Sequence, residues 1–470
     1  MIRLVLPLLL SGLLLLSGCA AVRSYDAELY TTLEHASGGA VDEAIRLLES
    51  NNRLPDKDLL YYLERGMLER LGGRYGESQK SWMAANARIQ GSSAGGMAEV
   101  ANFMRGMSSF VVNDKLRAYS GQDYEKTMLL TYMALNHLAL GDYENARVAI
   151  KQAHELEAQI AEQRARQYAE VEESARKRGA SISLKELNGY PVESIDTPEV
   201  NALRNCYQSA FSHYLAGFIY EALGEPSLAA PGYRLANELQ PDQPALEEAL
   251  RGLDQRVAAP DDGMTDVLFV IGSGSAPAIQ SRSFMLPVFV ESRTVLIANA
   301  FPVMTATSWS AAPSELQAEG QALPVTRVAS IDLMARRRLA DDMPGIMLRA
   351  TIRSAVGATL QYQAQRAAER EHTLAMALAA GVVMAGTAIF ASADDRTWRA
   401  LPAEVSIARA RLPRGKRTLS LQTPAGARSV DLELSGRYAV VDLRLLRQHL
   451  FVNAPRAGAL SQQVQIGSSR

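Results

Sequence analysis

The sequence predicts a multidomain α+β protein, in which an N-terminal solenoid of paired helices precedes a β-sandwich-like domain with a helical, apolar insert. Three observations predict this fold class. Residues 25–258 repeat one turn-and-helix pattern, whereas residues 265–450 contain short apolar or alternating runs that are typical of strands. The two parts also differ in charge: residues 20–262 contain 25 Lys and Arg against 36 Asp and Glu, and the chain from Gly263 onward contains 23 against 15. The stretch 259–264 between them is the expected linker.

The helical part contains three copies of a Leu-Gly turn that leads into a helix with regularly spaced small residues. Glycine relieves the tight turn, and alanine lets two helices approach closely. The pattern resembles the tetratricopeptide repeat, which implies stacked helix pairs with a concave binding surface. We therefore expect Gly141 to form a turn and Tyr143 and Ala146 to lie between paired helices. The turns lie at Leu71-Gly72, Leu140-Gly141 and Leu223-Gly224.

A highly charged run, Gln152 to Arg178, extends the helix that follows the second turn. Such a run is more typical of a solvated helix than of a ligand-binding face. The stretch Gly179 to Glu199, which contains two prolines, predicts an exposed loop.

The C-terminal part changes to the period of strands. We expect strands from about 264–330 and 400–450 to form the sandwich, split by a helical insert at about 331–393. The last strands should form a meander, and residues 451–470 should be a flexible tail. The strand candidates are 266–271, 283–290, 294–300, 405–412, 417–422, 429–434 and 438–445.

The N-terminus carries Arg3, an apolar run and then Leu16-Ser17-Gly18-Cys19. This arrangement predicts an export signal over residues 1–18. The last four residues resemble the lipobox of bacterial lipoproteins, which implies that lipid on Cys19 anchors the chain and that residues 19–24 are a tether. The residue after the cysteine is Ala20, and the resemblance therefore favours the outer membrane, facing the periplasm, over the inner membrane. The alternative is an ordinary signal peptide or membrane anchor with an incidental cysteine.

Two further motifs carry a second resemblance. The first motif comprises Tyr119, Gly121, Asp123, Tyr124 and Glu125, and the second comprises Asp394, Asp395, Arg396 and Trp398. Together with the repeats, they resemble an uncharacterised tetratricopeptide-repeat-containing lipoprotein family of Gram-negative bacteria, and this implies fold and location but no biochemical role. We expect the second motif to be structural, with Trp398 packed against the sandwich edge. We also expect an Asp–Arg pair, for which Arg349 or Arg353 are candidates, to fix the position at which the chain returns from the insert.

The segment Thr373 to Ser392 contains no charged residue and is long enough to span a bilayer as a helix. It is rich in alanine and glycine, which favours a helix buried in the fold or in a homo-oligomer. Reversible membrane contact and a stable membrane span are the alternatives.

No catalytic or metal-ligand motif is present, so we expect no cofactor, no metal and no enzymatic activity. Beyond Cys19, the one cysteine is Cys206, which we expect to be a buried, inert thiol. An exported protein rarely meets nucleic acid. The sequence therefore favours a membrane-anchored periplasmic scaffold or accessory factor, whose helical array binds a protein partner in a cell-envelope assembly. The alternative is an envelope-polymer hydrolase or transferase that uses carboxylates such as Asp394 and Glu404.

Overall fold

The computed structural model describes residues 25–103, 118–178, 187, 189–290, 293–306, 313, 315–371, 392–423 and 426–454. The expected signal peptide, Cys19 with its tether, nearly all of the apolar segment 373–392 and the end of the chain from residue 455 lie outside these residues. Among the described helices, none is long and apolar enough to cross a membrane.

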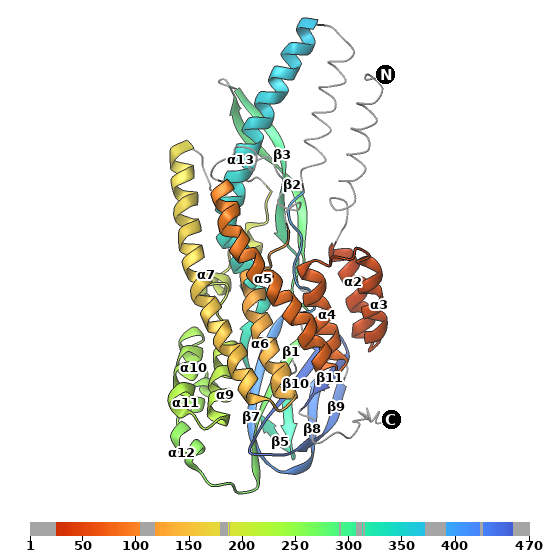
Figure 1. Cartoon of the computed structure of the whole chain (residues 1–470), viewed down its shortest axis with the longest axis vertical. Helices are drawn as coiled ribbons and strands as arrows, with labels where there is room; N and C mark the ends of the chain where they lie inside the picture. Colours follow the sequence, from red (N-terminus) through yellow and green to blue (C-terminus); the bar gives the residue numbers. More distant parts are fainter. Residues whose placement is uncertain are drawn as a thin grey trace.

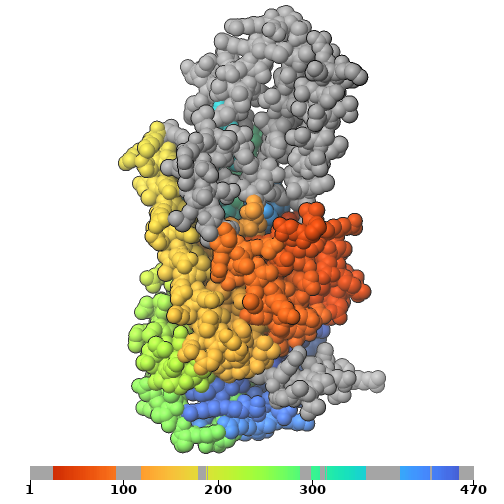
Figure 2. All heavy atoms as spheres, in the orientation of Figure 1, coloured from red at the N-terminus to blue at the C-terminus, as the bar shows by residue number. Residues whose placement is uncertain are grey.

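Helices make up the first half of the described chain and cover one side of the sheets (Figure 1). On the face shown in Figure 2, the helices hide most of the strands, which emerge at the lower margin. The helices are α2 (Tyr25–Ser37), α3 (Val41–Asn51), α4 (Leu59–Leu71), α5 (Tyr75–Phe103), α6 (Asp123–Ala139), α7 (Tyr143–Arg178), α8 (Pro198–Ala202), α9 (Ala210–Ala222), α10 (Pro226–Leu239), α11 (Pro244–Leu250) and α12 (Leu253–Ala258), with a single 3₁₀ turn η4 (Val192–Ser194).

Three antiparallel helix pairs, α4–α5, α6–α7 and α9–α10, form the core of the helical array. The turn of each pair contains a glycine with positive φ, at Gly73 (69°), Gly141 (76°) and Gly224 (78°). Ala146 is fully buried on α7. The closest approach to backbone atoms is at Gly232 on α10, where an added Cβ would lie 2.7 Å from the carbonyl oxygen of His213 on α9. Small residues therefore set the spacing of these helix pairs.

The strands form two larger sheets and one separate hairpin. A five-stranded sheet has the order β11-β10-β1-β7-β6, a four-stranded sheet has the order β5-β4-β8-β9, and β2 pairs only with β3. A hydrophobic cluster that includes Phe269, Leu421, Leu432 and Val441 joins the two larger sheets. The strands are β1 (Met264–Ser273), β2 (Ile279–Val290), β3 (Arg293–Met304), β4 (Glu315–Ala318), β5 (Gln321–Leu323), β6 (Thr326–Ser330), β7 (Glu404–Pro413), β8 (Gly415–Thr423), β9 (Gly426–Leu434), β10 (Tyr438–Leu446) and β11 (His449–Asn453).

The connectivity differs from the predicted meander. Strands β7 and β8 are consecutive but belong to different sheets, and β10 returns to pair in parallel with β1. Strands β2 and β3 form a hairpin that packs beside α13 (Ile331–Glu371) and not in either larger sheet. Strand β11 occupies residues 449–453, where the tail was expected to begin. Alternation predicts which side chains point inward, but it does not specify which strand lies next to which.

The first helix of each pair packs against the five-stranded sheet. Helix α4 contacts β11, α6 contacts β10, and α9 contacts β6, so the array crosses the sheet in the order of its strands. One hydrophobic cluster contains Leu135 of α6 and Phe218 of α9 together with Leu268 of β1 and Val440 of β10. The side of the array formed by the first helices is therefore covered by the chain's own sheet.

Candidate functional site

Buried polar clusters join the helical array to the C-terminal half of the chain. In the first, two glutamates on the inner helices bind the backbone of the extended segment 392–403, which leads into β7. The amide of Trp398 donates to Glu125 Oε1 (2.7 Å), and the amide of Ala400 donates to Glu64 Oε2 (3.0 Å). The amide of Arg399 also donates to Glu64. We call Glu64 and Glu125 the carboxylate clamp.

The first sequence motif builds one half of this clamp. Gln122 and Glu125 form a capping box at the start of α6, with the Gln122 amide donating to Glu125 Oε2 (2.9 Å). The same oxygen accepts a hydrogen bond from the hydroxyl of Tyr119 (2.5 Å). The hydroxyl of Tyr124 lies 2.8 Å from Oγ1 of Thr397. The two motifs, which are about 270 residues apart in the sequence, are thus in direct contact.

The remaining residues of the first motif have supporting positions. Gly121 has a φ of 79°, which favours glycine, and turns the chain into α6. Asp123 accepts a hydrogen bond from Arg164 of α7 (2.5 Å), and Arg164 also pairs with Asp342 of α13. Arg164 lies in the charged run that was expected to be solvated, but only 8% of it is exposed. That expectation is wrong for Arg164 because packing of α7 against α6 and α13 brings two carboxylates to it.

The carboxylate clamp is removed from solvent. Glu64 is 1% exposed and Glu125 is fully buried. Burial raises the pKa of Glu64 to about 8, against the opposing effect of the Arg399 and Ala400 amides. Burial likewise raises the pKa of Glu125, although the Tyr119 hydroxyl and the Gln122 and Trp398 amides oppose it. Both acids serve as hydrogen-bond acceptors inside the fold.

The second motif lies inside the array and not at the sandwich edge. Trp398 is fully buried, and its ring meets that of Trp82 on α5 edge to face, with the ring centroids 6.0 Å apart. Asp394 Oδ1 accepts a hydrogen bond from Nε of Arg396 (2.7 Å), two residues further along. Asp395 is 9% exposed. The predicted position of Trp398 is therefore wrong, because the segment passes beneath the helices before it joins β7.

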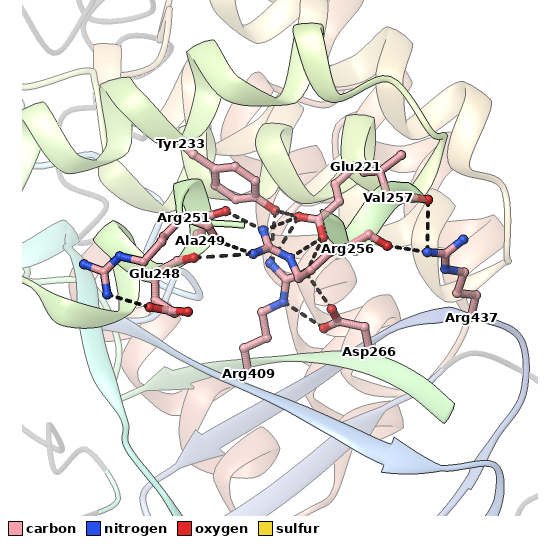
Figure 3. Close-up of polar contacts among 10 residues, drawn as sticks. All are labelled: Glu221, Tyr233, Glu248, Ala249, Arg251, Arg256, Val257, Asp266, Arg409 and Arg437. Carbon is pink, nitrogen blue, oxygen red and sulfur yellow. Dashed lines mark hydrogen bonds and ion pairs between the residues drawn. The ribbon is translucent and has the colours of Figure 1, made fainter. Parts of the chain in front are cut away.

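A second cluster joins α9 to strands β1 and β7 (Figure 3). Arg409 of β7 donates to Glu221 Oε1 of α9 (2.7 Å) and to Asp266 Oδ2 of β1 (2.7 Å). Arg256 of α12 donates to Glu221 Oε1 (2.8 Å), and the hydroxyl of Tyr233 of α10 donates to Glu221 Oε2 (2.6 Å). We call these residues the Glu221 cluster. It ties three helices to two strands.

The charges of the Glu221 cluster balance each other locally. Glu221 has no exposed surface. Burial would raise the pKa of Glu221, but hydrogen bonds from Arg256 and Arg409 together with the Arg409 charge hold it below its ordinary value. Sequence analysis missed this cluster because Glu221 and Arg409 belong to no motif. The one available signal was a lone acid on the largely apolar helix α9.

Two smaller clusters complete the contact between helices and strands. Arg70 of α4 donates to Asp442 Oδ2 of β10 (2.7 Å) and to Asn136 of α6 (2.5 Å), and Arg70 is 1% exposed. Tyr143, expected between paired helices, is half-buried and donates its hydroxyl to the carbonyl of Tyr438 on β10 (3.1 Å). Its main polar contact is thus with the sheet.

Metal-binding groups, surface hollows and the free thiol were the other candidate sites among the described residues. None of their His, Cys, Asp and Glu side chains gather in groups of three or more that could hold a metal ion. An open surface hollow between α3, α4 and α5 is lined by Arg46, Arg65 and Arg74, but each of these pairs with a neighbouring carboxylate. Burial raises the pKa of the Cys206 thiol to about 12, so it stays protonated at neutral pH.

Comparisons with known proteins add little. No family model and no curated protein matches the chain. Among solved structures, it is similar to a tetratricopeptide repeat protein from Parabacteroides merdae ATCC 43184. The two are 13% identical, the match covers 49% of this chain and 98% of the other, and the TM-score is 0.13. A score this low carries no argument, so the description of a helical repeat depends on the three helix pairs themselves.

Proposed function

We propose that this protein is a membrane-anchored periplasmic lipoprotein that acts as a protein-binding scaffold or accessory factor in a cell-envelope assembly. The observation that carries this proposal is a set of exposed apolar side chains on the outer helices of the array. Exposed large apolar side chains that gather on one surface are a common mark of protein-binding sites. The lipid anchor is inferred from the sequence around Cys19.

Three of the exposed apolar residues are close in sequence to the two partners of an ion pair that joins two helix pairs. Arg147 of α7 donates to Glu225, which precedes α10, at 3.0 Å. Val148 follows Arg147 and is 49% exposed, and Leu228 lies three residues after Glu225 and is 51% exposed. Leu140, at the turn before α7, is 48% exposed. We call Leu140, Val148 and Leu228 the outer apolar surface.

The covered side of the array limits where a partner can bind. The tetratricopeptide resemblance implied a partner on a concave face, but here strands β6, β10 and β11 cover the side formed by the first helices. Buried ion pairs such as Arg70–Asp442 and Arg409–Glu221 hold the two layers together. A partner would therefore bind the outer surface, which the Arg147–Glu225 pair holds in a fixed arrangement.

The test is co-purification of the full-length chain from detergent-solubilised envelopes. We expect the wild-type chain to retain a stoichiometric partner, and a Val148→Glu, Leu228→Glu variant to lose it. The matched control is Leu54→Glu, because Leu54 is 75% exposed in the loop between α3 and α4. A photo-crosslinking residue at position 148 should capture the same partner. A partner retained equally by all variants, or none at all, would contradict the proposal.

The anchor has a separate test. Cys19→Ala should move the protein from outer-membrane fractions to the soluble periplasmic fraction, because several buried acyl chains at roughly 0.8 kcal/mol per methylene are otherwise lost. A variant that still fractionates with the membrane would count against lipidation as the anchor.

The hydrolase alternative has less support. Asp394 is paired with Arg396, and Glu404 accepts a hydrogen bond from Arg327 (3.0 Å). Each of the two carboxylates is therefore already engaged by an arginine of the same chain. Turnover of muropeptides or glycans by the wild-type chain, lost in Asp394→Asn, would restore this alternative.

A further inference from the structure

The free edge of strand β9 differs from the other edges of the two larger sheets. Strand β5, at the opposite edge of the same sheet, has 3 residues. Strand β6 contains an irregularity between Arg327 and Ala329 and packs against α9, and β11 packs against α4. Strand β9 has 9 residues, and no described helix covers it. Proteins normally shorten, kink or cover such edges, because unpaired backbone groups attract other strands.

Strand β9 also lacks several of the usual protective features. Its sequence, GARSVDLEL, contains no proline and no lysine, and three of its inward side chains, Val430, Leu432 and Leu434, are buried and apolar. Arg428, at the start of the same face, is half-buried and is the one inward charge of this strand. It pairs with β8 along its full length. In an antiparallel ladder, every second residue points its N–H and C=O away from the neighbouring strand. Among the described residues, no further strand or loop pairs with those groups.

We propose that the chain's own C-terminal segment, residues 460–466, adds to this edge as a further strand. The sequence of the segment, Leu-Ser-Gln-Gln-Val-Gln-Ile, alternates in character. Leu460, Val464 and Ile466 fall on one face, with Gln462 between them, and the other face is entirely polar. This is the pattern of a strand with one buried and one solvated face. The apolar face would continue the row formed by Val430, Leu432 and Leu434.

The position of the chain end supports this occupant over any other. Ala454 is 8% exposed and belongs to the hydrophobic cluster that also contains Val430, Leu432 and Leu434. The chain therefore continues from the core that β9 covers. Residues 455–459 can span at most about 17 Å, and a strand of seven residues is about 24 Å long, against about 31 Å for β9. Stacked sheets lie about 10 Å apart, which is within this reach.

The expected consequence is a closed sheet edge. The added strand would satisfy the outward backbone groups of β9 and would stop two copies of the chain from pairing edge to edge. This interaction is independent of the lipid anchor and of the partner proposed above.

Hydrogen–deuterium exchange resolved to single amides tests the proposal on the full chain. We expect both alternating sets of β9 amides to be protected: one set by β8 and the other by the C-terminal segment. Gln465→Pro removes a backbone donor from the new strand, so the outward set should lose at least tenfold in protection while the β8-paired set is unchanged. The matched control, Ser469→Pro, lies beyond the segment and should leave both sets protected. Deletion of residues 460–470 should reproduce the Gln465→Pro result.

Three outcomes would overturn the proposal. Rapid exchange of the outward set in the wild-type chain would mean that the edge is open. Protection that survives the deletion in a monomer would mean that another part of the fold covers the edge. Protection that survives with a doubled mass in light scattering would mean that a second copy is the occupant. Unchanged protection of β1 and β10 amides shows in each case that the variant is folded.

Discussion

Single buried charges decide how the helices and the sheet of this protein are joined. Arg409 is the clearest case, because it faces Glu221 and Asp266 at once and is largely shielded from solvent. A buried ion pair contributes little net stability compared with an apolar replacement, but loss of one partner leaves an uncompensated charge. The arginine therefore specifies where β7 meets α9 more than it adds stability.

Arg409→Ala should lower the free energy of unfolding by about 3–5 kcal/mol, because Glu221 and Asp266 would remain buried without it. The control is Arg411→Ala on the same strand, where the Arg411–Asp262 pair is 55% and 45% exposed and should contribute less than about 1 kcal/mol. Urea denaturation followed by circular dichroism measures both. Equal losses in the two variants would show that the Glu221 cluster is not the buried junction described here.

A single methyl group at Gly232 should also be poorly tolerated. Its Cβ would lie 2.7 Å from the His213 carbonyl oxygen and 2.8 Å from the Gly217 amide nitrogen, and backbone atoms cannot move aside. Gly232→Ala should cost about 1–3 kcal/mol through overpacking. Gly76→Ala, in the first turn of α5, meets no atom within 4 Å and should be neutral or stabilising by up to about 1 kcal/mol. Melting temperatures that change alike would contradict the close approach of α9 and α10.

At the scale of the elements, helices α7 and α9 share a titratable contact. His154 of α7 stacks on His213 of α9 with ring centroids 4.6 Å apart. His213 Nε2 lies 3.1 Å from Glu157 Oε2, and Glu157 is 4% exposed. Glu157 belongs to the charged run that was expected to be solvated, and that expectation is wrong for it too, because α9 packs over this part of α7.

Acid should loosen this helix contact. Burial and the charge of His213, opposed by Glu157, lower the pKa of His154 to about 4, whereas an unfolded chain has a histidine pKa near 6.5. The unfolded state therefore binds the proton more tightly. The stability contributed by neutral His154 is complete above pH 6.5 and is lost as the pH falls towards 4.

His154→Gln should reduce the fall in melting temperature between pH 7 and pH 4.5. His35→Gln, which changes an exposed histidine on α2, is the control and should leave the wild-type slope unchanged. If the two variants show the same slope as the wild type, the α7–α9 contact does not sense acid.

At the scale of the whole molecule, the array and the sheets share one core. Trp82, Trp398, Leu268 and Phe451 belong to the same hydrophobic cluster, although they come from both sides of the expected linker at 259–264. The carboxylate clamp and the Glu221 cluster add polar contacts across the same boundary.

The full chain should consequently unfold in a single cooperative transition. If the sheet unfolded first, the inner faces of α4, α6 and α9 would be exposed. If the helical array unfolded first, the helix-facing side of the five-stranded sheet would be exposed. Thermal curves from near-ultraviolet and far-ultraviolet circular dichroism should coincide, with equal calorimetric and van't Hoff enthalpies. Two separated transitions would mean that the array and the sheet are independent domains.

The sequence by itself determined the local features of this protein. Glycines at Gly141 and Gly224 and the alanines after them predicted helix pairs, since turn geometry and close packing depend on neighbouring residues. The alternation of apolar and polar residues in 405–412 and 429–434 predicted strands with one apolar face turned inward, because alternation also depends only on neighbouring residues. Resemblance to one family identified two motifs, Tyr119–Lys126 and Asp394–Trp398. The two motifs are in contact in the fold.

Only the tertiary structure decided how these parts combine. Strand alternation is the same whether β10 pairs with β9 or, as it does, with β1, so pairing is fixed by the whole core. Likewise, the residues next to Glu64 or Arg409 in the sequence do not reveal whether the charged side chain lies in water or in the interior. Its role follows from burial and from partners up to about 336 residues away, and those are properties of the assembled fold.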